Sequence, residues 1–125
     1  MVTTFLQVAL GGAAGAMARY GLGLAFGRWT GPGIPLAVLT CNVVGSFAMG
    51  LFVVLAAQKG LTHLSPLIMT GLLGGFTTFS AFSLETVTLI ERGQAAEAAL
   101  YVGLSVVLSI GGLWLGVLSM RALLV

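Results

Sequence analysis

The residues with the clearest chemical potential lie together from Gly74 to Glu85, in the segment GGFTTFSAFSLE. Two adjacent glycines followed by two β-branched threonines are a weak place in a helix. A break near Gly74–Thr78 would free backbone carbonyls, which at bilayer depth are tolerated only where they face protein, water or an ion. The segment therefore suggests a broken helix with a buried ion site. The alternative is an intact helix whose hydroxyls bond to carbonyls four residues earlier.

Phe79 and Phe82 lie three residues apart and so share one face of a helix. The edge of a phenylalanine ring carries partial positive charge and can contact an anion without offering it a proton. The same spacing is typical of ordinary packing. The adjacent Ser80 and Ser83 favour a more polar environment.

Further polar side chains interrupt other apolar stretches. Asn42 offers two N–H donors; hydrogen bonding between helices is the commoner role of a buried amide, and binding an anion is the alternative. Tyr101, Ser105 and Ser109 repeat every four residues and form a hydroxyl stripe. That stripe predicts the lining of a polar crevice or of a seam between helices.

Ionisable residues in apolar stretches are functional hypotheses by default. Arg19 could draw anions toward a pore, and Glu85 could pair with Arg19 or with a cation. Arg121 is close enough to a helix end to reach the membrane surface, so we interpret it as structural. Catalytic motifs such as HExxH or a nucleophile elbow are absent from the sequence, so an enzyme is not expected. Clustered Lys and Arg are absent too, so no nucleic-acid partner is expected.

The elements that carry these residues are predicted from composition and length. Of 125 residues, 58% are hydrophobic and only 6% are charged, whereas soluble domains average roughly 25% charged residues. Four apolar stretches each exceed the ~20 residues that cross a bilayer as a helix. The chain is therefore predicted to be an all-α membrane protein, one domain over residues 1–125, with spanning helices at about 3–27, 34–58, 65–91 and 96–124.

Glycine spacing predicts that these helices pack closely. Small residues four apart let helix backbones approach each other inside lipid. Four pairs have this spacing: Gly11/Gly15, Gly23/Gly27, Gly71/Gly75 and Gly112/Gly116.

The basic residues barely define an orientation. Lys59 and Arg121 fall on one predicted side, and Arg28 and Arg92 on the other, with Arg19 near the helix end there. With so little positive-inside bias the chain could insert either way up. This permits an antiparallel dimer, and a weakly oriented protein with a single topology is the alternative.

The segment GGFTTFSAFSLE resembles the signature of the Fluc (CrcB) family of fluoride channels. The resemblance extends over the whole chain, through the glycine-rich first helix ending in Arg19 and through Asn42 with Gly45-Ser46. It implies an antiparallel, dual-topology homodimer, multi-pass in the cell (inner) membrane of a prokaryote. Such a channel passes fluoride down its gradient and so relieves fluoride toxicity.

The resemblance also implies roles for individual residues. Arg19 and Glu85 would lie near the pore entrances, and the backbone carbonyls of Gly74 and Thr77 from both subunits would hold a structural Na⁺ that is not transported. The fluoride pathway would contain Asn42, Phe79, Phe82, Tyr101, Ser105 and Ser109. We expect Ser80 and Ser83, which are adjacent to the rings in sequence, to belong to the same pathway.

Two other classes compete with the channel. Small multidrug exporters are also four-helix dual-topology dimers, but they depend on a membrane-embedded carboxylate in the first helix, where this chain has no acidic residue. A non-conducting membrane assembly subunit would explain the glycine spacing but not the hydroxyl stripe.

Overall fold

A computed structural model describes residues 1–27 and 33–125, and the regular secondary structure of this part of the chain is all helical, with no strand. Arg28, which entered the predicted charge balance, lies outside the described residues. The helices, with η1 a 3₁₀ turn and η2 a π-helix, are α1 (Val2–Gly27), α2 (Leu36–Lys59), η1 (Thr62–Leu64), η2 (Pro66–Leu73), α3 (Gly74–Phe76), α4 (Phe79–Glu91) and α5 (Ala95–Leu123).

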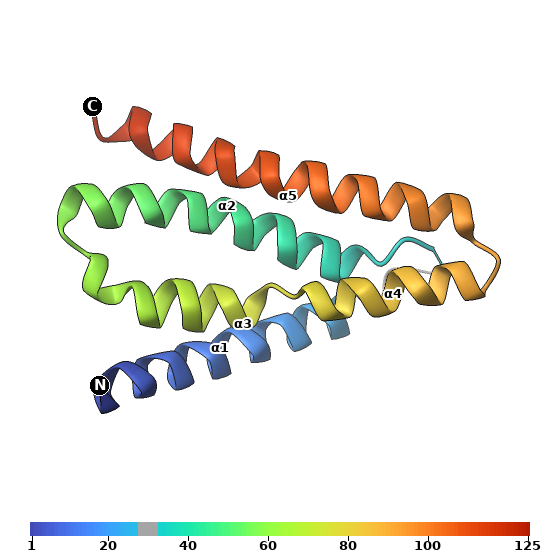
Figure 1. The fold of residues 1–125 in the computed structure, drawn as a ribbon, viewed down its shortest axis with the longest axis horizontal. Coiled ribbons are helices and arrows are strands. Elements are labelled where there is room, and N and C mark those ends of the chain that lie inside the picture. The colour runs from blue at the N-terminus through green and yellow to red at the C-terminus, as the bar shows by residue number, and fades with distance from the viewer. Residues whose placement is uncertain (28–32) are drawn as a thin grey trace.

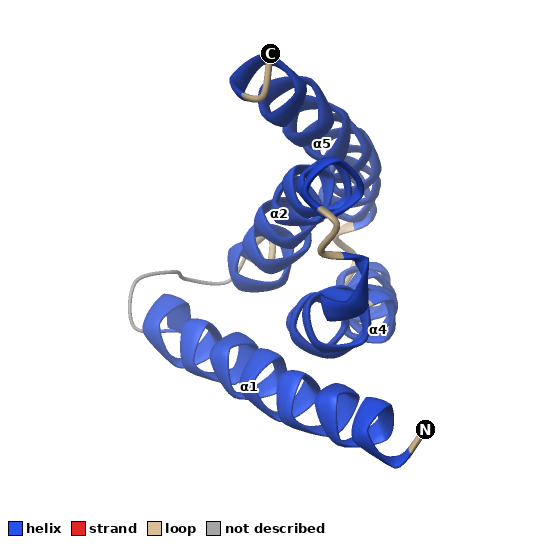
Figure 2. Ribbon diagram, turned by 90° about the vertical axis from the view of Figure 1, so that its left-hand side faces the viewer, coloured by secondary structure: helices blue, strands red, loops and turns tan. Residues whose placement is uncertain are grey.

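The helices form a bundle along one long axis, in which segments consecutive in sequence run in opposite directions, so α2 and α5 run parallel to each other (Figure 1). η2, α3 and α4 follow one another as a single, interrupted rod between α2 and α1, called the third rod below because it corresponds to the third predicted span. Figure 2 shows α1 inclined beneath this rod and α5 at the opposite side of the bundle, next to α2. Both termini lie at the same end of the long axis.

Among the described residues, three helical segments are long and apolar enough to cross a membrane. They are Leu36–Lys59, Thr62–Glu91 and Ala95–Leu123, with mean hydropathies of 2.1, 1.5 and 2.0. α1 has sufficient length at 26 residues, but Gln7, Arg19 and its glycines lower its hydropathy. Three of the four predicted spans therefore satisfy the criterion, and the span at α1 stays a prediction.

Glycine also forms two of the turns that join the helices. Gly60 follows α2 with φ 67°, and Gly93 lies between α4 and α5 with φ 76°. Left-handed backbone is strained for residues with a Cβ, so glycine suits both positions. The Gly60 N–H donates to the carbonyl of Ala56 and closes the end of α2.

Glycine pairs bring α1 against the third rod, as predicted. A Cβ added to Gly15 would collide with the Leu72 carbonyl and would lie 2.8 Å from the Phe76 nitrogen. A Cβ on Gly75 would lie 2.6 Å from the Gly12 carbonyl oxygen. The backbones of the two elements are therefore in direct contact, which only glycine allows.

The seam between α2 and α5 has the same construction. A Cβ on Gly116 would lie 3.2 Å from the Cα of Gly50 and would collide with the Phe47 carbonyl. Gly112 faces Val43 across the same seam, where an added Cβ would lie 3.4 Å from the Val43 carbonyl oxygen. The pair Gly23/Gly27 behaves differently, because a Cβ at either position meets nothing within 4 Å in this chain.

Candidate functional site

The third rod is interrupted at two threonines. α3 ends at Phe76, Thr77 (φ −89°, ψ 154°) and Thr78 (φ −155°, ψ 124°) are extended, and α4 begins at Phe79. This is the segment in which the glycines and threonines suggest a weak helix. The Thr78 hydroxyl accepts a hydrogen bond from the Ala81 N–H at 3.1 Å and so caps α4.

Hydroxyls along this rod also bond to their own helix, as the alternative interpretation of the sequence expected. The Thr77 hydroxyl donates to the Leu73 carbonyl at 2.9 Å, and the Thr86 hydroxyl to the Phe82 carbonyl at 2.8 Å. These local bonds therefore occur together with the interruption.

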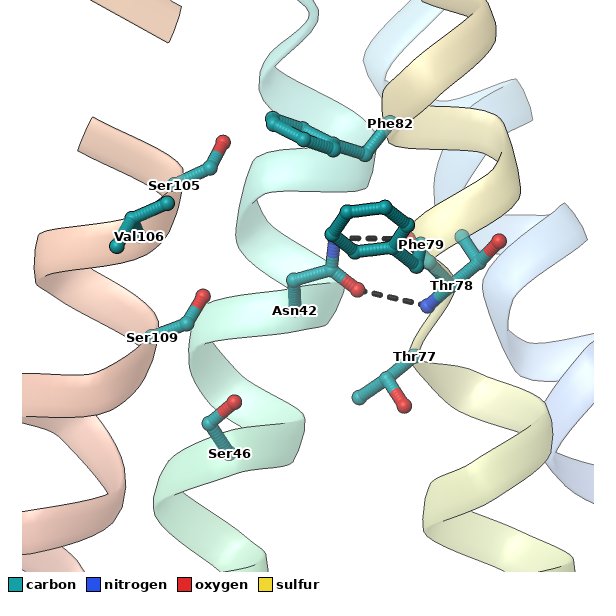
Figure 3. Close-up of a pocket in the computed structure, with 9 residues that line it drawn as sticks. All are labelled: Asn42, Ser46, Thr77, Thr78, Phe79, Phe82, Ser105, Val106 and Ser109. Carbon is teal, nitrogen blue, oxygen red and sulfur yellow. Dashed lines mark hydrogen bonds between the residues drawn. The ribbon is translucent and has the colours of Figure 1, made fainter. Parts of the chain in front are cut away.

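Asn42, in the N-terminal half of α2, contacts the interruption from the neighbouring helix. Its Nδ2 donates to the Thr78 carbonyl at 3.1 Å, and its Oδ1 accepts from the Thr78 N–H at 2.7 Å (Figure 3). The amide thus serves as a hydrogen-bonding link between helices, the commoner of its two predicted roles. The bond to the carbonyl uses one of the two N–H groups of Nδ2.

Arg19 contacts the interruption from the other side. Its Nε donates to the Gly75 carbonyl at 3.1 Å, and this bond connects α1 to the end of α3. Carbonyls at the end of a helix carry partial negative charge and are stabilised by a cation. Side chains from two different helices therefore bind backbone groups beside the interruption.

A cavity of about 240 Å³ opens beside the interruption, between α2, α4 and α5. It is lined by Asn42, Ser46, Thr77, Thr78, Phe79, Phe82, Ser105, Val106 and Ser109. In Figure 3 the serines of α5 face the amide of Asn42 and the aromatic rings across this space. The lining combines hydroxyls, an amide and ring edges with no ionisable side chain, so it presents neutral hydrogen-bond donors.

Five of the eight predicted pathway residues line this cavity: Asn42, Phe79, Phe82, Ser105 and Ser109. Ser80 and Ser83 do not; Ser80 lies 3.2 Å from the Thr78 hydroxyl, and the Ser83 hydroxyl donates to the Phe79 carbonyl at 2.9 Å. Ser46 was not among the predicted pathway residues. Its position four residues after Asn42, on the same helical face, was the available signal.

Tyr101, the remaining predicted residue, lies beneath the cavity wall. It is fully buried, and its hydroxyl donates to Glu85 Oε2 at 2.7 Å. Its ring packs against Phe82 with centroids 5.2 Å apart, and Phe82 packs against Phe79 at 5.4 Å. Phe82 is 8% exposed and Phe79 is 78% exposed, so this series of three rings leads from the core to the surface of the chain.

Arg19 and Glu85 line a second cavity of about 310 Å³ between α1, α2 and α4, with Tyr20, Gly23, Leu24, Ala37, Val38 and Cys41. Each already has another partner, since the Glu85 carboxylate accepts from Tyr101 and Arg19 donates to Gly75. The two predicted entrance residues are thus brought to one cavity and are each held in place by a second residue.

The family model described as CrcB-like protein, Camphor Resistance (CrcB), matches residues 6–117. This chain belongs to the CrcB family. Relatives named "Fluoride-specific ion channel FluC" include one from Ruegeria sp. (strain TM1040), 62% identical over 125 residues and 99% of both chains. Another, from Jannaschia sp. (strain CCS1), is 72% identical over 92 residues, 73% of this chain and 88% of the relative. The family resemblance inferred from GGFTTFSAFSLE is confirmed.

In this CrcB chain the cavity contains a hydroxyl without a protein partner. Ser105 Oγ is buried and makes no hydrogen bond within the described residues. An unsatisfied buried polar group costs roughly 1–3 kcal/mol. A hydrogen-bond acceptor entering the cavity would remove that cost, because a serine hydroxyl can rotate to donate.

The interruption also changes the hydrogen bonding of Gly74. In an unbroken helix the Thr78 N–H would donate to the Gly74 carbonyl, but here it donates to Asn42 Oδ1. Gly74 is exposed on the surface of the chain, while Thr77 is partly buried. The Gly74 carbonyl is thereby left without its helical donor.

Proposed function

We propose that this protein is a fluoride-selective channel that passes F⁻ down its gradient across the cell (inner) membrane and so lowers cytoplasmic fluoride. The observation that carries the proposal is the cavity beside the interrupted helix, with Asn42, Ser105, Ser109 and two phenylalanine rings in its lining. The names of the relatives support the same ion.

The chemistry of this lining suits fluoride. A strongly hydrated small anion enters a membrane pathway only where donors replace its water, and it leaves only where no single site binds it too tightly. Neutral hydroxyls, one amide N–H and ring edges meet both conditions. A lysine or arginine in the lining would instead hold the anion strongly. A larger anion such as chloride needs a wider passage, so a narrow path with closely spaced donors favours fluoride.

α1 is proposed as the fourth span. Its 26 residues, at about 1.5 Å each, extend about 39 Å, which exceeds a hydrocarbon core of ~30 Å. It contacts the third rod along its glycines, and its one cation, Arg19, is hydrogen-bonded to the Gly75 carbonyl. An even number of spans also agrees with the position of both termini at one end of the bundle.

The proposed assembly is an antiparallel homodimer with mixed membrane orientation. Phe79 is 78% exposed in the single chain although it lines the cavity. Gly74, at the same interruption, is exposed as well. A second copy placed against this region would cover both residues and enclose the open side of the cavity. The balanced basic residues allow the opposite orientation that such a copy requires.

A structural Na⁺ is proposed at the centre of this dimer, bound by the backbone carbonyls of Gly74 and Thr77. The fit rests on the Gly74 carbonyl, whose helical donor is instead bonded to Asn42. Two carbonyls per chain become four across a two-fold axis, and hard oxygen ligands suit a hard cation. The ion would supply positive charge that lowers the cost of an anion in the membrane.

The test is reconstitution of the purified protein into liposomes loaded with fluoride, followed with a fluoride-selective electrode. A channel should release fluoride only when valinomycin and K⁺ compensate the charge, and a chloride electrode should record little release. Release without valinomycin that follows a proton gradient would instead identify the dual-topology exporter. Protein-free liposomes are the control, and no release of either anion would contradict the proposal.

A further inference from the structure

A third cavity lies away from the interrupted helix, at the end of the bundle where α2 and α5 both terminate (Figure 1). It measures about 320 Å³ and is lined by Val53, Val54, Ala57 and Gln58 from α2 and by Val117 and Arg121 from α5. It begins one turn beyond the contact of Gly50 with Gly116. None of its residues lines the cavity assigned to fluoride.

The lining residues are arranged by depth. They form three pairs at i, i+4 spacing, so each pair lies along one face of its helix: Val53/Ala57, Val54/Gln58 and Val117/Arg121. In each pair the valine is deeper in the helix and the second residue is closer to the end. The crevice therefore has apolar walls toward the membrane interior and an amide with a guanidinium at its mouth.

The charged side chains at this end of the bundle are basic. Arg121 is in the last turn of α5, and Lys59 is the last residue of α2. The three acidic side chains lie elsewhere: Glu85 and Glu91 on α4, and Glu97 in the first turn of α5, at the opposite end. A negatively charged group at the mouth of the crevice would meet no carboxylate side chain there.

We propose that this crevice binds an anionic phospholipid. The phosphate of the lipid is held by the Arg121 guanidinium and the Gln58 amide, and one acyl chain of the lipid packs against the valine side chains. Arginine presents several N–H donors in a planar fork that suits phosphate, and basic sites between membrane helices are typical of anionic lipid recognition. Interaction of Arg121 with the carbonyls at the end of α5 would explain a cation there. It would not explain the apolar crevice that this cation and Gln58 border.

The experiment uses Trp114, which is 67% exposed on α5 three residues before Val117. The sequence has 2 tryptophans, so Trp29→Phe leaves Trp114 as the single fluorophore. The protein is reconstituted into phosphatidylcholine vesicles that contain a small, equal fraction of either phosphatidylglycerol or phosphatidylcholine brominated on the acyl chain. We expect brominated phosphatidylglycerol to quench Trp114 at least twofold more strongly than brominated phosphatidylcholine.

Two substitutions that each remove one positive charge distinguish this site from general attraction to the anionic membrane surface. Arg121→Gln should abolish the preference for phosphatidylglycerol. Lys59→Gln, which removes one positive charge at the same end but outside the crevice, should preserve it. Val117→Phe keeps both polar groups and fills the apolar space, so it should also reduce the preference while the protein elutes normally in size-exclusion chromatography.

Three results would overturn the proposal. Equal quenching by the two lipids would leave Arg121 as a residue that only reaches the membrane surface. Equal loss of preference in Lys59→Gln and Arg121→Gln would mean diffuse surface charge. Absence of quenching by either lipid would mean that a second copy of the chain covers the crevice.

Discussion

Asn42 and Thr78 are joined by two hydrogen bonds in opposite directions, 3.1 Å from Nδ2 to the Thr78 carbonyl and 2.7 Å from the Thr78 N–H to Oδ1. One side-chain amide therefore binds both backbone groups of an extended residue, and it replaces the helical acceptor that the Thr78 N–H has lost. Such groups cost several kcal/mol when they are left unpaired in lipid. The interruption of the third rod and the amide on α2 thus depend on each other.

Asn42→Asp is expected to keep the hydrogen-bond acceptor of this side chain and to remove its donor. A carboxylate still accepts from the Thr78 N–H, but it cannot donate to the Thr78 carbonyl, and it places negative charge in the proposed anion pathway. We expect fluoride efflux to fall at least tenfold, corresponding to about 1.4 kcal/mol or more in the barrier. Efflux equal to the unmodified protein would show that Asn42 lies off the pathway, and a size-exclusion profile checks assembly.

Phe79→Ile and Phe82→Ile test whether the rings contact the ion. The swap keeps hydrophobicity and much of the volume, so packing alone predicts a loss of stability under ~1.5 kcal/mol. Any such loss should be larger for Phe82, which is 8% exposed, than for Phe79, which is 78% exposed. The positive ring edge is removed at either position, so fluoride flux should fall severely in both variants.

Methionine is the matched comparison at these two positions. It is flexible and polarizable, and we expect it to retain more flux than isoleucine does. If both isoleucine variants conduct like the unmodified protein, the aromatic pair is only core packing.

The sequence predicted the elements well because apolar runs and glycine spacing are local properties. It was less informative about partners across the bundle. Arg19 reaches Gly75 over 56 positions and Asn42 reaches Thr78 over 36, and those contacts depend on how each helix is rotated. The extended Thr77 and Thr78 also shift the helical phase between η2 and α4. Counting residues along the chain therefore could not tell which hydroxyls face the cavity.

The serines show this limit directly. Ser80 and Ser83 were assigned to the pathway from their proximity to the rings, but they do not line the cavity. Ser46 lines it although it is distant from the rings in sequence. Ser105 and Ser109 both line the cavity, because α5 is one uninterrupted helix from Ala95 to Leu123 and residues four apart lie on the same face of it.

Ser105→Ala should lower fluoride flux without lowering stability. The Ser105 hydroxyl is buried without a protein partner, so its removal relieves an unsatisfied group and should leave thermal stability unchanged or raise it by about 1 kcal/mol. Fluoride efflux should nevertheless fall, because a donor in the proposed pathway is lost. Ser119→Ala, on the same helix but outside the cavity, is the control and should alter neither property. A Ser105→Ala variant with full flux would exclude this hydroxyl from the pathway.

Removal of Na⁺ tests the proposed central cation. Replacing Na⁺ on both sides of the membrane with N-methylglucamine, a cation too large for a site of four carbonyls, should weaken fluoride flux. Thr77→Ser should have little effect, because the proposed ligand is the backbone oxygen. Undiminished flux after exhaustive Na⁺ removal would reject the cation.

Gly15→Ala and Gly23→Ala form a matched pair on α1 that tests the close contact of this helix with the third rod. A Cβ at Gly15 collides with the Leu72 carbonyl and lies 2.8 Å from the Phe76 nitrogen, whereas a Cβ at Gly23 meets nothing within 4 Å in the chain. Backbone atoms cannot rotate away as a side chain does, so Gly15→Ala must push α1 outward. That movement would stretch the bond from Arg19 to the Gly75 carbonyl, 3.1 Å long here.

Helix propensity acts the other way, since alanine is favoured over glycine by up to ~1 kcal/mol in a helix. Gly23→Ala should therefore be neutral or slightly stabilising, and Gly15→Ala should lower thermal stability and fluoride flux together. Thermal unfolding in detergent and liposome efflux measure the two effects. If Gly15→Ala is as stable as Gly23→Ala, α1 does not pack on the third rod through its glycines, and its proposed place as the fourth span loses its main support.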